Sequence, residues 1–154
     1  MAKIKASMAD VSTEYTLPDP GLYIFRVKEV QEETKQAKAE RSGANIERTT
    51  YRIESRIVRD IDGNEEHVNK PVWDYVNIHT KEGELNTISL ANLKRYFEAI
   101  APEYADSEDA DTDMLVNGEF LASLYHDEYE AHGETRVSAK IKPSSISPVP
   151  AATV

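Results

Sequence analysis

Basic residues recur at even spacing in two stretches of the chain. Six of them fall into two sets whose spacing places side chains on one face of a β-strand: Arg48, Arg52 and Arg56, then Arg136, Lys140 and Lys142. Phosphate groups need cationic donors along a groove, and the planar fork of arginine suits them. Both sets therefore predict surfaces that contact a phosphodiester backbone. Alternating charge is also how an antiparallel strand presents its solvent face, so this simpler interpretation stays open.

Three further cations and three aromatic residues could complete such a surface. Lys35, Lys38 and Arg41 lie between the first two expected strands, and we expect them to form a mobile flap over a bound strand. Unstacked bases bind to exposed aromatic faces, and each base–aromatic stack contributes about 1–3 kcal/mol. The candidate stacking residues are Trp73, Tyr75 and Tyr23. Aromatic side chains more often belong to a core, and that alternative stays open too.

The sequence lacks the common signatures of catalysis and metal binding. Asp109, Asp111 and Asp113 have the alternate spacing of a calcium loop, but Met114 and Phe120 occupy the positions that need glycine and glutamate. We find no cysteine, phosphate-binding glycine loop or serine nucleophile elbow. The histidines have no zinc spacing and are expected in solvent: His67, His79, His126 and His132. We therefore expect a binding protein rather than an enzyme, without metal or cofactor; a metal-dependent nuclease is the third hypothesis.

Charge is distributed unevenly along the chain. The net charge is −10, and the segment 102–134 holds 11 acidic residues and no lysine or arginine. The segment 21–60 contains nine basic and seven acidic residues. Screening confines exposed charge to about 8 Å at physiological salt, so a local basic face can act within an acidic protein. The acidic loop 103–113 supports an alternative function, in which it docks a partner protein.

The length of 154 residues predicts one domain. We expect a flexible segment at 1–14, a folded domain at 15–143 and a disordered tail at 144–154. No run of 18 apolar residues predicts a membrane helix, and the segment 1–10 has no apolar stretch typical of a signal peptide. A cytoplasmic protein without membrane contact is therefore expected.

Hydrophobic periodicity predicts five strands and one helix. The strands are expected at 22–30, 46–58, 72–78, 118–126 and 135–142, and the helix from Thr87 or Ser89 to about Ile100. The polar segment 32–45 lacks periodicity and is expected to be a long, mobile loop, whereas Asp62-Gly63 predicts a tight hairpin turn. A mainly β fold with one helix between the third and fourth strands is the layout of a five-stranded OB-like antiparallel barrel. An α+β sheet with one covering helix is the competing architecture.

Several motifs occur in an order that resembles a family of small bacteriophage proteins, which are usually encoded among replication and recombination genes. The matching segments are 15–23, 38–45, 46–58, 72–78, 97–101, 111–118 and 142–143. The resemblance implies an OB-like fold and largely sequence-independent binding of single-stranded DNA in phage replication or recombination. It implies a location in the cytoplasm of the infected bacterial host. Tyr75 departs from the family pattern, because relatives are expected to carry a basic residue there.

The same resemblance implies possible protein partners. Single-stranded DNA-binding proteins often recruit replication or recombination proteins through an acidic tail, whereas the acidic segment here is internal. Any such recruitment would fall to the loop 103–113. The sequence leaves three questions open: whether the protein is a homo-oligomer, whether it prefers DNA to RNA, and which sheet face binds.

Overall fold

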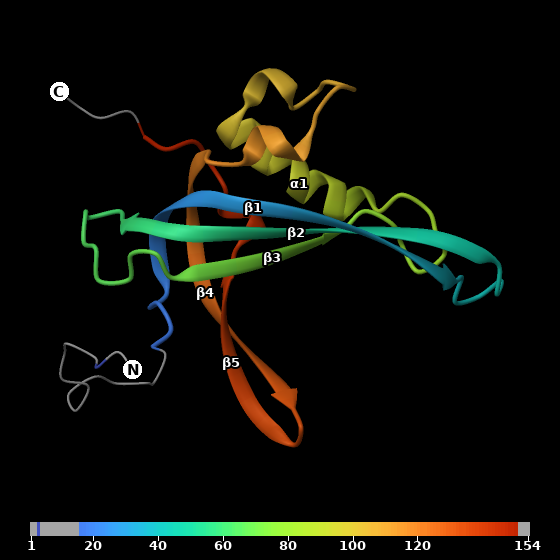
Figure 1. Cartoon of the computed structure of the whole chain (residues 1–154), viewed down its shortest axis with the longest axis horizontal. Helices are drawn as coiled ribbons and strands as arrows, with labels where there is room; N and C mark the ends of the chain where they lie inside the picture. The colour runs from blue at the N-terminus through green and yellow to red at the C-terminus, as the bar shows by residue number, and fades with distance from the viewer. Residues whose placement is uncertain (1–2, 4–15, 151–154) are drawn as a thin grey trace.

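The computed structural model describes residue 3 and residues 16–150, and this part of the chain is mainly β (Figure 1). Its five antiparallel strands form one sheet in the order β3-β2-β1-β4-β5. The strands are β1 (Gly21–Lys38), β2 (Asn45–Asp60), β3 (Pro71–Asn77), β4 (Glu119–Ala131) and β5 (Glu134–Ile141). The helix α1 (Thr87–Ile100) lies between β3 and β4 in the chain. Three short 3-10 helices complete the described part: η1 (Pro102–Tyr104), η2 (Thr112–Leu115) and η3 (Pro143–Ser145).

The predicted mainly β architecture, with one helix between the third and fourth strands, is confirmed for the described residues. The sheet is not closed by hydrogen bonds, because β3 and β5 form its two edges and no ladder joins them there. These edges nevertheless approach each other, with Cα atoms of β3 and β5 within 8 Å. Closure into a barrel therefore stays a prediction.

Alternating apolar side chains build the core on the inner face of the sheet. The buried strand residues include Tyr23, Phe25, Val27, Ile53, Ile57, Val72, Val76, Phe120, Ala122, Leu124 and Ile141. Phe25 and Phe120 stack with ring centroids 5.3 Å apart, and Tyr96 from α1 meets Phe120 edge-on at 5.2 Å. This burial explains why alternation located the strands, since only the inner side chains leave water.

The helix α1 covers this core with one apolar side. Tyr96 and Phe97 are buried, and the Tyr96 hydroxyl donates a 2.7 Å hydrogen bond to Asp74 of β3. Asn86 caps the helix by accepting from the backbone N–H of Ser89, so the expected cap at Thr87 or Ser89 is wrong by one position or more. The contact between Tyr96 and Asp74 fixes α1 against the edge strand β3.

The expected mobile loop at 32–45 is instead a continuation of the β1–β2 hairpin. The two strands pair without interruption from Glu29 and Glu54 to Lys38 and Asn45, and only residues 39–44 form the turn. Most side chains of this extension are solvent-exposed, so no apolar alternation marks it in the sequence. Figure 1 shows this hairpin projecting as one arm and the β4–β5 hairpin as a second arm in a different direction.

Two connections also differ from expectation. Asp62 and Gly63 do not form a tight hairpin turn but begin the longer connection 61–70, in which the Asp60 carboxylate accepts hydrogen bonds from the backbone N–H groups of Asp62 and Asn64. After β5, Ile146 is buried and its neighbour Ser147 exchanges two 2.9 Å backbone hydrogen bonds with Leu121. The packed part of the chain therefore continues into the segment expected to be a tail, while the expected flexible segment 1–14 lies outside the described residues except for residue 3.

Candidate nucleic-acid interface

The first basic set lies on the solvent side of β2, together with two aromatic side chains of β3. Arg52 pairs across the ladder with Tyr75, and Glu54 pairs with Trp73, so these side chains share one face. Trp73 is 44% exposed and Tyr75 is 62% exposed. We call the surface formed by these five residues the outer face: Arg48, Arg52, Arg56, Trp73 and Tyr75. It combines planar cations with accessible aromatic rings.

The three arginines of the outer face differ in how far the protein uses their charge. Arg56 donates to Glu54 through Nε at 3.1 Å and to the Asn69 carbonyl at 2.9 Å. Partial desolvation acts to raise the pKa of Glu54, but the hydrogen bond and charge of Arg56, with the charge of Lys28, lower this pKa overall. Arg56 is therefore engaged within the protein.

Arg48 and Arg52 keep most of their donor capacity. Within the described residues Arg52 forms no hydrogen bond or ion pair, and Arg48 makes only a long 3.5 Å contact to the His79 carbonyl. The Nε atoms of both arginines are buried without a partner among residue 3 and residues 16–150. The terminal guanidinium N–H groups of Arg52 have no partner among the described residues, so they remain able to donate to a phosphate.

Two neighbouring hollows flank Tyr75 on the outer face. Their volumes are about 460 and 530 Å³, and both have Tyr75, Thr50 and Glu33 in their walls. Arg48 lines the first hollow and Arg52 the second. The surface is therefore grooved rather than flat, with an arginine beside the aromatic ring in each groove.

The expected flap residues lie at the far end of the first arm. Lys35 and Lys38 belong to β1, where Lys35 pairs across the ladder with Arg48. Lys35 contacts Glu33 at 3.4 Å, and Lys38 is exposed. The turn that carries Arg41 is attached to the loop after β3, because its backbone N–H donates to Glu82 at 2.8 Å. Lys35 lines the first hollow, and all three cations belong to a tethered hairpin rather than to the mobile flap that we expected.

The second basic set lies on the β4–β5 arm. Arg136 pairs across the ladder with Tyr129, and Lys140 pairs with Tyr125, so the four share one face of the arm. Both tyrosines are about two-fifths exposed, at 45% and 41%. Arg136 forms no ion pair among the described residues, whereas Lys140 contacts Asp127 at 2.8 Å, a hydrogen bond that raises the pKa of Lys140. This arm thus repeats the combination of exposed aromatic ring and cation.

The second set approaches β3 at one point. Burial raises the pKa of Asp74 in β3, and the charge of Lys140 is among the interactions that act to lower it. Lys142 follows β5, is exposed and places its backbone N–H on the Ser123 carbonyl. β5, which carries Arg136 and Lys140, therefore approaches β3, the neighbour of the strand that carries the first set, although hydrogen bonds do not join β3 and β5.

Tyr23 is not available for stacking. It is 5% exposed, meets Phe25 edge-on at 6.1 Å, and its hydroxyl donates to the Asp19 carbonyl at 2.7 Å. Burial, followed by the negative charges of nearby acidic groups, raises the pKa of Tyr23. The prediction is wrong because Tyr23 shares its strand face with Phe25 and Val27, and this alternation was visible in the sequence.

The acidic loop 103–113 lies on the other side of β2. Asp111 lines a hollow with Tyr51, and its charge contributes to raising the Tyr51 pKa after burial and Glu32. Tyr51 and Arg52 are successive residues of one strand, so they point to opposite faces. The acidic loop is therefore separated from the outer face by the sheet.

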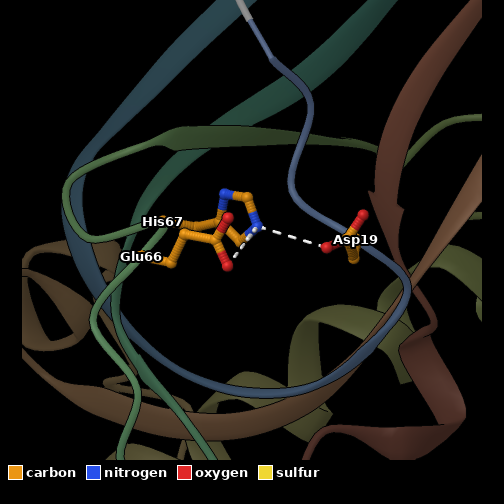
Figure 2. A group of neighbouring side chains, drawn as sticks. All are labelled: Asp19, Glu66 and His67. Carbon is orange, nitrogen blue, oxygen red and sulfur yellow. Dashed lines mark ion pairs between the residues drawn. The ribbon is translucent and has the colours of Figure 1, made fainter.

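The sequence analysis missed a second cluster, drawn in Figure 2. His67 is only 7% exposed, although we expected it in solvent, and its Nε2 lies 3.5 Å from Asp19 and 4.0 Å from Glu66. His79 is also partly buried, and its Nδ1 accepts from the backbone N–H of Thr49. No sequence signal connects Asp19 with His67, because only the fold brings the segment before β1 to the connection after β2.

The sequence was compared with protein-family models and with curated proteins. No protein-family model matches the sequence, and no curated protein is detectably similar to it. Among the helices of residues 16–150, none is long and apolar enough to cross a membrane.

Proposed function

We propose that the protein binds single-stranded DNA, without strong sequence preference, as a bacteriophage replication or recombination protein with an OB-like fold. The observation that carries this proposal is the outer face, where exposed Trp73 and Tyr75 stand beside the under-used guanidinium groups of Arg48 and Arg52. OB-folds bind oligonucleotides on the face of their second and third strands, between the loops that follow the first and fourth strands. Both arms of this protein occupy those loop positions.

The arrangement of the strands supports the OB-like part of the proposal. OB barrels are five-stranded and partly open. Here β3 and β5 approach each other without a ladder, and α1 lies between β3 and β4 in the chain. Lys140 belongs to β5 and Lys142 follows it, so both would extend a phosphate track that starts at Arg48 and Arg52.

The chemistry of the outer face favours a single strand over a duplex. Residues 73 and 75 are two positions apart on one strand, about 6.6–6.8 Å, which suits consecutive bases of an extended chain. Each base–aromatic stack contributes about 1–3 kcal/mol and tolerates any base. Bases in a duplex keep their faces stacked on each other, so Trp73 and Tyr75 could not reach them without unpairing.

The test is a titration of fluorescent oligo-dT with the full chain at low salt, with a duplex of equal length as the control. We expect tight, salt-sensitive binding that selects the single strand. An equally long oligo-U separates DNA from RNA preference. Absence of binding at low salt, or equal affinity for the duplex, would reject the proposal.

The segregated acidic loop favours a second function, the docking of a basic partner protein of replication or recombination. Glu103, Glu108 and Asp109 are exposed there, on the side of β2 that faces away from the outer face. Replacement of these three by Gln, Gln and Asn keeps the shape of the loop while it removes three charges. We expect the replacement to abolish capture of such a partner while oligo-dT binding is retained; unchanged capture would reject this second function.

A further inference from the structure

The segment before β1 and the connection 61–70 meet around one buried histidine. Asp19 comes from the first segment, and Glu66 and His67 come from the second (Figure 2). One ligand atom from each of the three lies within 4.8 Å of the other two. A hollow of about 240 Å³ adjoins them, lined also by Asp60 and Asp62. Four carboxylates and one imidazole thus surround a single cavity.

His67 is the unusual member of this group. Its side chain is 7% exposed, and its Nε2 atom is buried without a hydrogen-bond partner in the part of the chain that the structure describes. This atom points at the two carboxylates but lies 3.5 Å from Asp19 Oδ2 and 4.0 Å from Glu66 Oε2, beyond ordinary hydrogen-bond length. Tyr23 meets the ring edge-on at 6.4 Å and limits its movement. The protein therefore holds a buried imidazole nitrogen toward two acids without bonding them.

These separations match a pair of ligands across a metal ion. Zinc bonds to nitrogen and oxygen of about 2.0–2.2 Å in tetrahedral geometry put two ligand atoms about 3.3–3.6 Å apart. The separation of His67 Nε2 from Asp19 Oδ2 already lies in that range. Glu66 needs a small shift, and its side chain is 78% exposed and free to make it.

We propose that His67 Nε2, with the carboxylates of Asp19 and Glu66, binds a divalent transition-metal ion, for which zinc is the best match. Imidazole with carboxylates suits zinc, whereas calcium and magnesium prefer oxygen ligands alone. The fourth position would face the hollow and take water. The ion would join the segment before β1 to the β2–β3 connection, and so would stabilise the fold at a place separate from the outer face.

Lys70 sets a condition on this site. Its Nζ lies 2.8 Å from Nδ1 of His67 and donates to the Thr16 carbonyl at 2.7 Å. Metal coordination uses the lone pair on Nε2, so Nδ1 must carry the proton and the ammonium group must move away from it. Lys70→Gln removes the cation and offers an amide oxygen that can accept from Nδ1–H. This variant should bind the ion at least as tightly as the native protein.

The experiment uses the full chain, stripped of metal with a chelator. Zinc is titrated by calorimetry, and cobalt serves as a spectroscopic probe of tetrahedral nitrogen and oxygen ligands. We expect one site per chain, a melting temperature that rises with zinc, and affinity reduced at least tenfold in Asp19→Asn and Glu66→Gln. Asp19 and Glu66 are exposed, so these variants should fold even if His67→Gln does not.

His132→Asn is the matched control. His132 is an exposed histidine at φ 53°, a backbone conformation that asparagine tolerates. The control should bind zinc like the native protein. Absence of saturable binding, or equal binding by the Asp19, Glu66 and His67 variants, would overturn the site. Oligo-dT binding is measured in parallel. Absence of zinc binding would not reject the proposed DNA binding, and absence of DNA binding would not reject the zinc site.

Discussion

Removal of both Arg48 and Arg52 gives the most direct test of the outer face. The double replacement R48A/R52A breaks no ion pair among the described residues, since Arg52 has no partner and Arg48 has only a 3.5 Å contact to a carbonyl. Arg56 would be a poor choice, because its loss would leave Glu54 without its principal partner. The double variant therefore changes the binding surface while the fold keeps its contacts.

The expected magnitude follows from counterion release. Each phosphate contact contributes about 0.7 to the slope of log affinity against log salt for a single strand. Loss of two contacts should reduce the slope by about 1.4. Between 50 and 200 mM salt, the variant should therefore lose roughly sevenfold less affinity than the native protein.

Fluorescence anisotropy with labelled oligo-dT at four salt concentrations measures this slope. Arg95→Ala controls for the loss of a positive charge away from the interface, because Arg95 belongs to α1 and lies outside the outer face. The control should keep the native slope. If R48A/R52A also keeps the native slope, these arginines do not contact phosphate and the proposed interface is wrong.

Three further predictions concern stacking, buried charge and packing. Tyr75→Ala should weaken oligo-dT binding by about 1–3 kcal/mol with an unchanged salt slope, and Tyr104→Ala, outside the interface, should not. Burial raises the pKa of Asp74, so the native carboxyl favours folding at acidic pH and loses that contribution as pH rises through the raised value. Urea unfolding should thus show Asp74→Asn gaining stability relative to the native protein between pH 4 and 7; a relative loss would contradict the sign. Gly118→Ala should lower the melting temperature markedly, because the added Cβ would clash with Cγ2 of Ile100, and an unchanged melting temperature would refute that packing.

The sequence predicted those elements that bury one face. Thr49, Ile53 and Ile57 alternate in β2 with arginines, and this pattern located the strand and grouped its arginines on one face. The helix α1 was also predicted, because Leu93, Tyr96 and Phe97 recur at helical spacing. In both cases one side of the element is buried in the core, so its apolar residues recur with the period of that element.

The first arm could not be predicted in this way. Between Gln31 and Lys38 most side chains of β1 are exposed, and the backbone ladder with β2 does not depend on which polar residue carries it. Thr34 and Thr49 do join their hydroxyls at 2.9 Å, but such a pair is visible only once the register is known. Strands held by pairing alone leave no hydrophobic period in the sequence.

The candidate binding sites could also be predicted only in part from the sequence. Parity along β2 predicted that Arg48, Arg52 and Arg56 share one face. It could not show that Glu54 would engage Arg56 and that Arg52 would have no partner among the described residues. Nor could any local pattern bring Asp19 to His67, which belong to segments joined only through the fold. Spacing fixes which face a side chain takes, whereas its partners depend on the three-dimensional neighbours.

The acidic net charge of −10 is compatible with a DNA-binding face because the acidic loop 103–113 lies on the other side of the sheet, although Glu33 and Glu54 lie among the cations of the outer face. On one side of β2, the charge of Asp111 contributes to the raised pKa of Tyr51. On the other side, Arg52, the next residue, lines the hollow beside Tyr75. Exposed charges more than about 8 Å apart are largely screened at physiological salt, so the acidic loop does little to the potential at the outer face there. At low salt the same loop repels DNA from the opposite side. A strand would then approach the surface that carries the arginines and aromatic rings, so the uneven charge favours one binding orientation.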